Sequence, residues 1–98
     1  MADIGRHVEA LVQRITQGDG HASREAREAA FAKPEGALLG KVAQHAYRVT
    51  DEDVAAAKTE RSEDEVFELV ACAAVGQAKR QYDSALAALD AACNAKGA

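Results

Sequence analysis

Hydrophobic residues recur along this chain at the three- and four-residue spacing of an α-helix, from near its N-terminus to near its C-terminus. In the first segment Ile4, Val8 and Ile15 fall on one helix face, and Gly18-Asp19-Gly20 ends the pattern. A second, shorter helix is expected over residues 23–32. The spacing of the hydrophobic residues therefore predicts helices, and it lacks the alternation that is typical of strands.

Two further helices are expected in the middle of the chain. Lys33-Pro34-Glu35-Gly36 interrupts the second helix, because proline removes a backbone donor and fits best at a helix start. A third helix is then predicted over about 35–48. Its apolar seam is expected to hold Leu38, Val42, His45 and Val49. A short fourth helix is predicted to begin at Thr50.

Capping signals mark where the last two helices begin. Thr50 and Ser62 are each followed three residues later by an acid, Asp53 and Glu65, which is the pattern of a capping box. Much of the acidic cluster at residues 51–68 has the same explanation, since carboxylates in a first turn interact favourably with the helix dipole. A site for a cation or a basic partner is the alternative interpretation of this cluster.

The last helix is predicted over about 62–94, and its apolar stripe is unusually wide. At about 100° per residue the stripe covers roughly 200° of arc, twice what a surface helix needs. The stripe consists of Val66, Phe67, Val70, Ala71, Ala74, Val75, Ala78, Tyr82, Ala85, Leu86, Leu89 and Ala92. This helix is therefore either central to the bundle or part of a subunit interface.

Length and composition favour one small helical domain spanning 1–98. Hydrophobic residues make up 48% of the chain but aromatic residues only 4%, with no tryptophan, so few side chains fill volume. Such a core gains burial by association, and we expect an all-α bundle of about five helices that forms a homo-oligomer.

Charge and hydropathy narrow the classes of partner. The net charge is −4, without a clustered basic face or stacking aromatics, which disfavours nucleic acid. No apolar run approaches the length of a membrane span, so no membrane partner is expected. Cys72 and Cys93 do not form a disulfide framework, and without a recognisable targeting signal the expected compartment is the cytoplasm.

Motifs that would identify a cofactor are absent from the sequence. There is no H-E-x-x-H, C-x-x-C, G-x-S-x-G, Walker-type loop or dinucleotide fingerprint, and the three histidines share no metal-ligand spacing. We therefore expect neither a metal nor another cofactor.

Two stretches carry a resemblance to a known family. They are 46–54, AYRVTDEDV, and 62–70, SEDEVFELV. Together with the surrounding residues 41–80 they resemble the helical core of the carboxymuconolactone decarboxylase and alkylhydroperoxidase-D-like superfamily. The resemblance implies an all-α, alkylhydroperoxidase-D-like fold with a long C-terminal helix and self-association, which is common in that family.

The same resemblance argues against peroxidase chemistry. Peroxidase members of that family carry a C-x-x-C-x-x-x-H run before the turn that matches Ser62, and counting back places His45, Arg48 and Glu52 at its three positions. None of these forms a disulfide. Lys33 stands where those peroxidases have a relay glutamate, and 59–61 replaces a turn that ends in glycine.

Four residues remain as candidates for a site. His45 and Glu68 are the candidate catalytic acid/base groups, and Tyr47 and Arg48 are the candidate ligand-binding groups. The alternative interpretations are structural: His45 as a hydrogen-bonded core residue, Tyr47 as a packing aromatic with an exposed hydroxyl, and Glu68 in an ion pair with a basic residue such as Arg48 or Lys79.

Two classes of function stay open at this point. The first is a non-redox, self-associating scaffold or a protein that binds a partner or a small organic acid. The second is a decarboxylase or lactone-processing enzyme that uses His45 and Glu68 in place of thiols, so whether the chain is an enzyme remains open. A pocket lined by His45, Tyr47 and Glu68 would favour the enzyme.

Overall fold

The computed structural model describes residues 2–97 of the chain, and the side chains of residues 5–94. Ile4, at the start of the first predicted face, therefore lies outside the described side chains. The helices are α1 (Ala2–Gln17), α2 (Arg24–Ala32), α3 (Gly36–His45), the 3-10 turn η1 (Ala46–Arg48), α4 (Asp51–Glu60) and α5 (Glu63–Gly97). The described part contains no strand, so the expected all-α bundle with a long C-terminal helix is confirmed.

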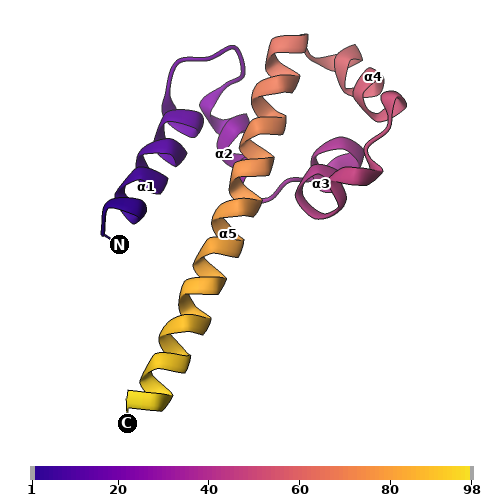
Figure 1. Ribbon diagram of the computed structural model, residues 1–98. Coiled ribbons are helices and arrows are strands. Elements are labelled where there is room, and N and C mark those ends of the chain that lie inside the picture. Colours follow the sequence, from indigo (N-terminus) through magenta and orange to yellow (C-terminus); the bar gives the residue numbers. More distant parts are fainter. Residues whose placement is uncertain (1, 98) are drawn as a thin grey trace.

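The N-terminal half of α5 is the axis around which the other helices pack. The most extensive contacts of α5 are with α2 and α3, while α1 touches both α2 and α5, and α4 touches α5 only lightly (Figure 1). The core is small, with Ala22, Ala30, Leu69 and Cys72 at its centre. Alanine-rich sequence therefore produces closely approaching helices around α5.

The closest of these approaches is at Gly76 of α5. A side chain at Gly76 would overlap the backbone carbonyl of Phe31, so only glycine lets the end of α2 lie against α5 at this point. One turn further along, Arg80 Nη1 donates to that same Phe31 oxygen at 2.7 Å. A carbonyl left without a helical partner at the end of α2 is thereby satisfied.

The helix starts that the sequence predicts are confirmed. Thr50 and Asp53 form a complete capping box at α4. At α5 the Ser62 N–H donates to Glu65 Oε1 and the Glu65 N–H donates to Ser62 Oγ, both at 3.2 Å. Ser23 caps α2 by accepting from the Ala26 N–H at 3.1 Å.

The predicted third helix is longer than the observed one. α3 ends at His45, whose φ and ψ of −145° and 62° leave the helical region, and η1 follows. Val49 and Thr50 are extended because Thr50 must adopt that conformation to cap α4. The start of α4 therefore limits the length of α3, and Val49 does not continue its seam.

The C-terminal half of α5 projects beyond the bundle. In Figure 1 it extends well below the other helices, and every residue from 83 to 94 is exposed. The radius of gyration is 15.9 Å, whereas a compact domain of this size has about 13 Å. No helix within the described residues has the length and apolarity needed to cross a membrane.

Candidate functional site

The carboxylate of Glu68 holds the turn between α1 and α2 against α5. Its two oxygens accept from the His21 N–H at 2.8 and 2.9 Å, and Glu68 Oε2 also accepts from the Ala22 N–H at 3.2 Å. Of the basic residues named as its possible partners, Lys79 binds Asp83 at 2.6 Å instead, and the basic side chain found beside Glu68 is that of His21. Glu68 therefore acts as a structural clamp.

Gly20 and His21 complete this clamp. A side chain at Gly20 would meet the Glu68 carboxylate where it now lies, so the Glu68 side chain would have to shift to make room for it. The His21 ring lies between two acids, with Nδ1 at 3.5 Å from Glu68 and Nε2 at 3.7 Å from Asp64. Since the His21 side chain is 67% exposed, these contacts are weak surface interactions.

Beneath the clamp lie a buried guanidinium and a buried thiol. The carbonyl oxygen of Ile15 accepts from Arg27 Nη1 at 3.1 Å and from Cys72 Sγ at 3.6 Å. Burial raises the pKa of the Cys72 thiol, and this effect outweighs the opposing influence of the Arg27 charge. Cys72 is 0% exposed, so it is a protonated thiol out of contact with solvent, as a structural cysteine is.

His45, Tyr47 and Arg48 form a small cluster at η1. The His45 and Tyr47 rings meet edge to face with centroids 5.9 Å apart, and the Arg48 guanidinium lies 5.9 Å from the Tyr47 ring centre. Tyr47 is 80% exposed and His45 is exposed as well. The alternative of His45 as a core residue is wrong, because α3 ends at His45 and leaves its ring exposed, and the exposure of Tyr47 shows that more than its hydroxyl is in solvent.

The structure thus does not bring all four candidate residues together, because Glu68 has different contact partners from the other three. It groups His45, Tyr47 and Arg48 at η1, whereas the oxygens of Glu68 are occupied by the backbone of residues 21 and 22. A general acid/base pair needs a hydrogen-bonded partner within about 3 Å. The described contacts of His45 include no such partner.

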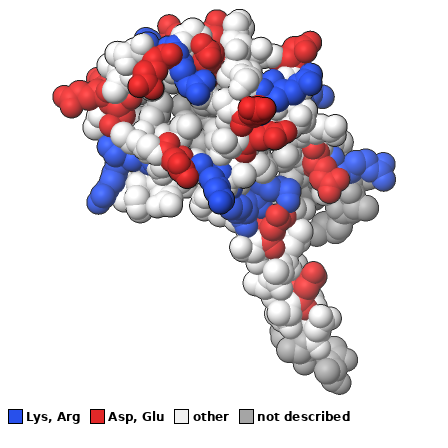
Figure 2. All heavy atoms as spheres, turned by 180° about the vertical axis from the view of Figure 1, so that it is seen from behind, with Lys and Arg blue, Asp and Glu red and all other residues white. Residues whose placement is uncertain are grey.

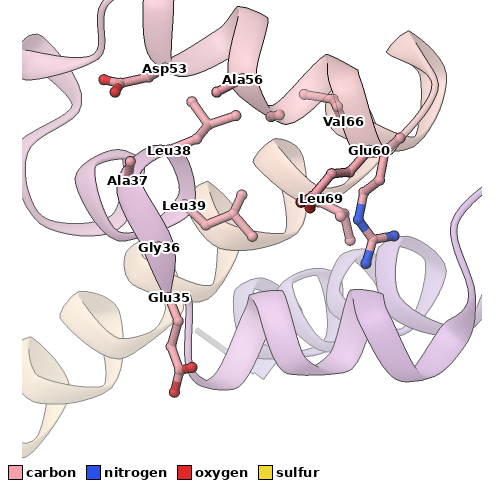
Figure 3. A pocket seen from close by; sticks show the side chains of 12 residues that line it. Glu35, Gly36, Ala37, Leu38, Leu39, Asp53, Ala56, Glu60, Val66 and Leu69 are labelled. Carbon is pink, nitrogen blue, oxygen red and sulfur yellow. The ribbon is translucent and has the colours of Figure 1, made fainter.

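A cavity lies elsewhere, between α3, α4 and α5. It measures about 330 Å³, and Leu38 and Leu39 project into it towards Val66 and Leu69 (Figure 3). On its edge, Asp53 accepts from Lys41 Nζ at 2.7 Å, which together with the Thr50 N–H lowers the pKa of Asp53. None of the four candidate residues lines this cavity.

The sequence does not point to this cavity, because its wall depends on where α4 folds back. α4 has no buried residue and packs only lightly on α5, so its position follows from its two flanking turns. The one sequence signal near the cavity is the capping box, which fixes where α4 starts but not its direction.

The other unusual feature is an exposed apolar surface on α5. The side that packs on the bundle holds Val66, Leu69, Cys72, Ala73 and Gly76. About 180° away lies a second apolar side, which we call the outer face. It consists of Phe67, Ala74, Ala78, Tyr82, Ala85 and Leu89.

The predicted apolar stripe lies partly on the packed side of α5 and partly on its exposed sides. Of the stripe, Val66 is buried, whereas Phe67 is 64% exposed and Leu89 54% exposed. Ala74 and Ala78 are exposed as well. Periodicity identified the apolar positions, but most of them lie on the side that the bundle leaves uncovered.

Neither the arrangement of possible metal ligands nor comparison with known proteins indicates a further site. Among the described residues, no three His, Cys, Asp or Glu side chains converge as they would to hold a metal ion. Comparison of the chain with models of protein families, with curated proteins and with solved structures finds no significant match in any of the three.

Proposed function

We propose that this protein is a non-redox helical scaffold that works by self-association, and that a second copy of the chain covers the outer face of α5. One observation carries the proposal: a continuous apolar face stays exposed along a helix that projects out of its own bundle. Exposed apolar surfaces of this extent mark interaction sites in soluble proteins.

The distribution of charge along α5 supports this assignment. Beyond Gly76 the packed side becomes polar and carries Arg80, Asp83 and Asp90. The outer face, by contrast, stays apolar as far as Leu89. At about 100° per residue, every charged residue between 66 and 94 lies at least about 80° away from Ala78.

This contrast distinguishes an interface from a solvent-exposed helix. A helix end that only projects into water has no reason to keep one side free of charge over its whole length, because a surface helix is polar on its outer side. In Figure 2 the body of the molecule carries dispersed blue and red groups, while the described part of the projecting half carries a few red groups among uncharged residues. The projecting half is therefore suited to contact with another apolar surface.

A second copy is the occupant that the composition favours. The shape is less compact than a single domain of this length, and the core is built mainly from small side chains. Both properties fit a chain that completes its burial by pairing. The proposal also agrees with the resemblance to the carboxymuconolactone decarboxylase superfamily, whose members commonly self-associate.

The decarboxylase or lactone-processing alternative receives no comparable support. It needs acid/base groups that converge on a bound molecule, but Glu68 is committed to the backbone of the 20–22 turn and His45 faces solvent. The 330 Å³ cavity is the place where a small organic acid would fit by size, yet it contains none of the proposed catalytic side chains.

Ala78→Glu tests the proposal, because Ala78 lies at the middle of the outer face and is exposed within one chain. We expect the wild-type chain to scatter light at micromolar concentration as a species larger than 10.3 kDa. Ala78→Glu should weaken association by more than about hundredfold, since a buried unpaired charge costs about 3 kcal/mol or more.

Ala87→Glu is the matched control, because it introduces the same side chain about 180° around the helix from Ala78. It should leave the assembly intact. Far-ultraviolet circular dichroism should show that both variants keep the helix content of the wild type. A wild-type chain that stays at 10.3 kDa at all concentrations would disprove the proposal.

A further inference from the structure

We infer that two copies pair α5 against α5 in antiparallel orientation, around a two-fold axis that passes beside Ala78. This inference rests on the proposed self-association and adds its orientation and register. A two-fold interface uses the same surface on both copies, so residues at equal distances before and after the axis must fit each other.

The side chains of the outer face meet this condition about Ala78. Phe67 and Leu89 lie eleven residues before and after Ala78, so an antiparallel pair places these two large groups opposite each other. Four residues from Ala78, the large Tyr82 would face the small Ala74 of the other copy. Small residues at the centre allow the two helix backbones to approach closely.

Parallel pairing fits the same side chains less well. It would set Phe67 against Phe67 and Tyr82 against Tyr82, with only alanines meeting between them. The helices would be held apart at the large residues and would leave gaps at the small ones, which wastes packing energy. Antiparallel pairing distributes large and small groups evenly along the contact.

The projecting half of α5 gains a partner in this arrangement. Residues 83–94 of one copy would run along the half of α5 that is embedded in the other copy's bundle, because both halves are equally far from Ala78. The outer face from Phe67 to Leu89 is about 33 Å long at 1.5 Å per residue. Each copy would thus cover the outer face that the other copy's own bundle leaves exposed.

The natural Cys93 distinguishes the two orientations. Cys93 is exposed and lies fifteen residues after Ala78. In the antiparallel pair the two Cys93 residues are about 45 Å apart along the helices, far beyond the roughly 7 Å that a disulfide allows between Cα atoms. In a parallel pair they would lie at the same level along the two helices, within reach of each other.

The test is cysteine cross-linking under a mild oxidant such as diamide. On a Cys93→Ser background, where the remaining Cys72 is buried, Ala78→Cys should shift most of the chain from 10.3 kDa to twice that mass on a non-reducing gel. Ala87→Cys is the matched control on the opposite side of the helix and should stay at 10.3 kDa. The wild-type chain, with its natural Cys93, should also stay uncross-linked.

A second pair of variants tests the antiparallel register at positions away from residue 78. Phe67→Cys and Leu89→Cys chains, each on the Cys93→Ser background, should cross-link when mixed and not when oxidised separately. Rapid Cys93–Cys93 cross-linking in the wild type would overturn the antiparallel orientation. Failure of Ala78→Cys and of the mixed pair in a chain that light scattering shows to be dimeric would overturn the register and leave the proposed self-association standing. A chain that is monomeric by light scattering overturns both.

Discussion

At the residue scale, the two cysteines of this chain have opposite environments on one helix. Cys72 is fully buried and Cys93 is exposed. Because they are 21 residues apart on one helix, they are about 30 Å apart and cannot reach each other within a chain. Neither takes the place of a redox pair, so burial and distance explain in physical terms why thiol peroxidase chemistry is not expected.

The buried thiol should make the fold sensitive to alkaline pH. Burial raises the pKa of Cys72 in the folded chain above its ordinary 9.0, so between these two values the folded state holds a proton that the unfolded state has lost. The stabilising contribution is complete below pH 9.0 and is lost as the pH rises through the folded-state pKa.

This sensitivity is measurable by urea unfolding between pH 7 and about pH 10.5. Cys72→Ala should show a smaller loss of unfolding free energy across this range than the wild type, even though its cavity lowers stability at pH 7. Cys93→Ala, which changes an exposed thiol, should keep the wild-type pH dependence. Equal slopes for all three chains would show that Cys72 does not titrate differently on folding.

At the element scale, α4 depends on its cap more than the other helices do. It has no buried residue, so tertiary packing contributes little to its stability and local interactions contribute most. Thr50→Ala removes the hydroxyl that accepts from the Asp53 N–H at 3.2 Å. The expected loss is about 1 kcal/mol, within the usual range for a capping residue.

A threonine-to-alanine substitution at the other end of α4 is the control. Thr59 bonds back to the Ala56 carbonyl within the helix, and Thr59→Ala should be neutral or slightly stabilising, because alanine is the better helix former. Chemical denaturation and the amide signals of α4 would separate the two effects. A Thr50→Ala chain with unchanged α4 signals would contradict the dependence on the cap.

The helix starts were predictable from sequence because caps are local. Thr50 with Asp53 and Ser62 with Glu65 need only residues three positions apart, and the structure confirms both. The end of α3 was not predictable in the same way. The helix could continue its apolar seam to Val49, or the backbone could become extended so that Thr50 caps α4. Hydrophobic periodicity indicates only the first of these two possibilities.

At the scale of the whole molecule, sequence predicted the fold class but did not decide which side of α5 packs against the bundle. Periodicity locates apolar positions, but α5 is apolar on two opposite sides near residues 66–76, so the pattern does not decide between them. The choice follows from Gly76, where the absence of a side chain permits close approach to the backbone of α2, and from Glu68, which binds the turn between α1 and α2.

The candidate site was predictable only in part for a related reason. His45, Tyr47 and Arg48 are close in sequence and were expected in one region, and the structure groups them. The partners of Glu68 come from a turn 46 and 47 residues away, and no local pattern announces a contact of that range.

Because half of α5 projects from the bundle, its backbone amides should not all be equally protected from exchange with solvent. Amide protons exchange with solvent when a helix opens locally, and opening is easiest where no neighbouring chain covers the backbone. Residues 83–94 have only the rest of α5 to hold them, whereas residues 66–76 are embedded in the bundle. Exchange from 83–94 should slow as protein concentration rises, and by a larger factor than exchange from 66–76, which the bundle already protects in a single chain. In Ala78→Glu the exchange of 83–94 should stay fast at every concentration, and slow exchange in dilute wild-type protein would mean that the projecting half is stable as an unaccompanied helix.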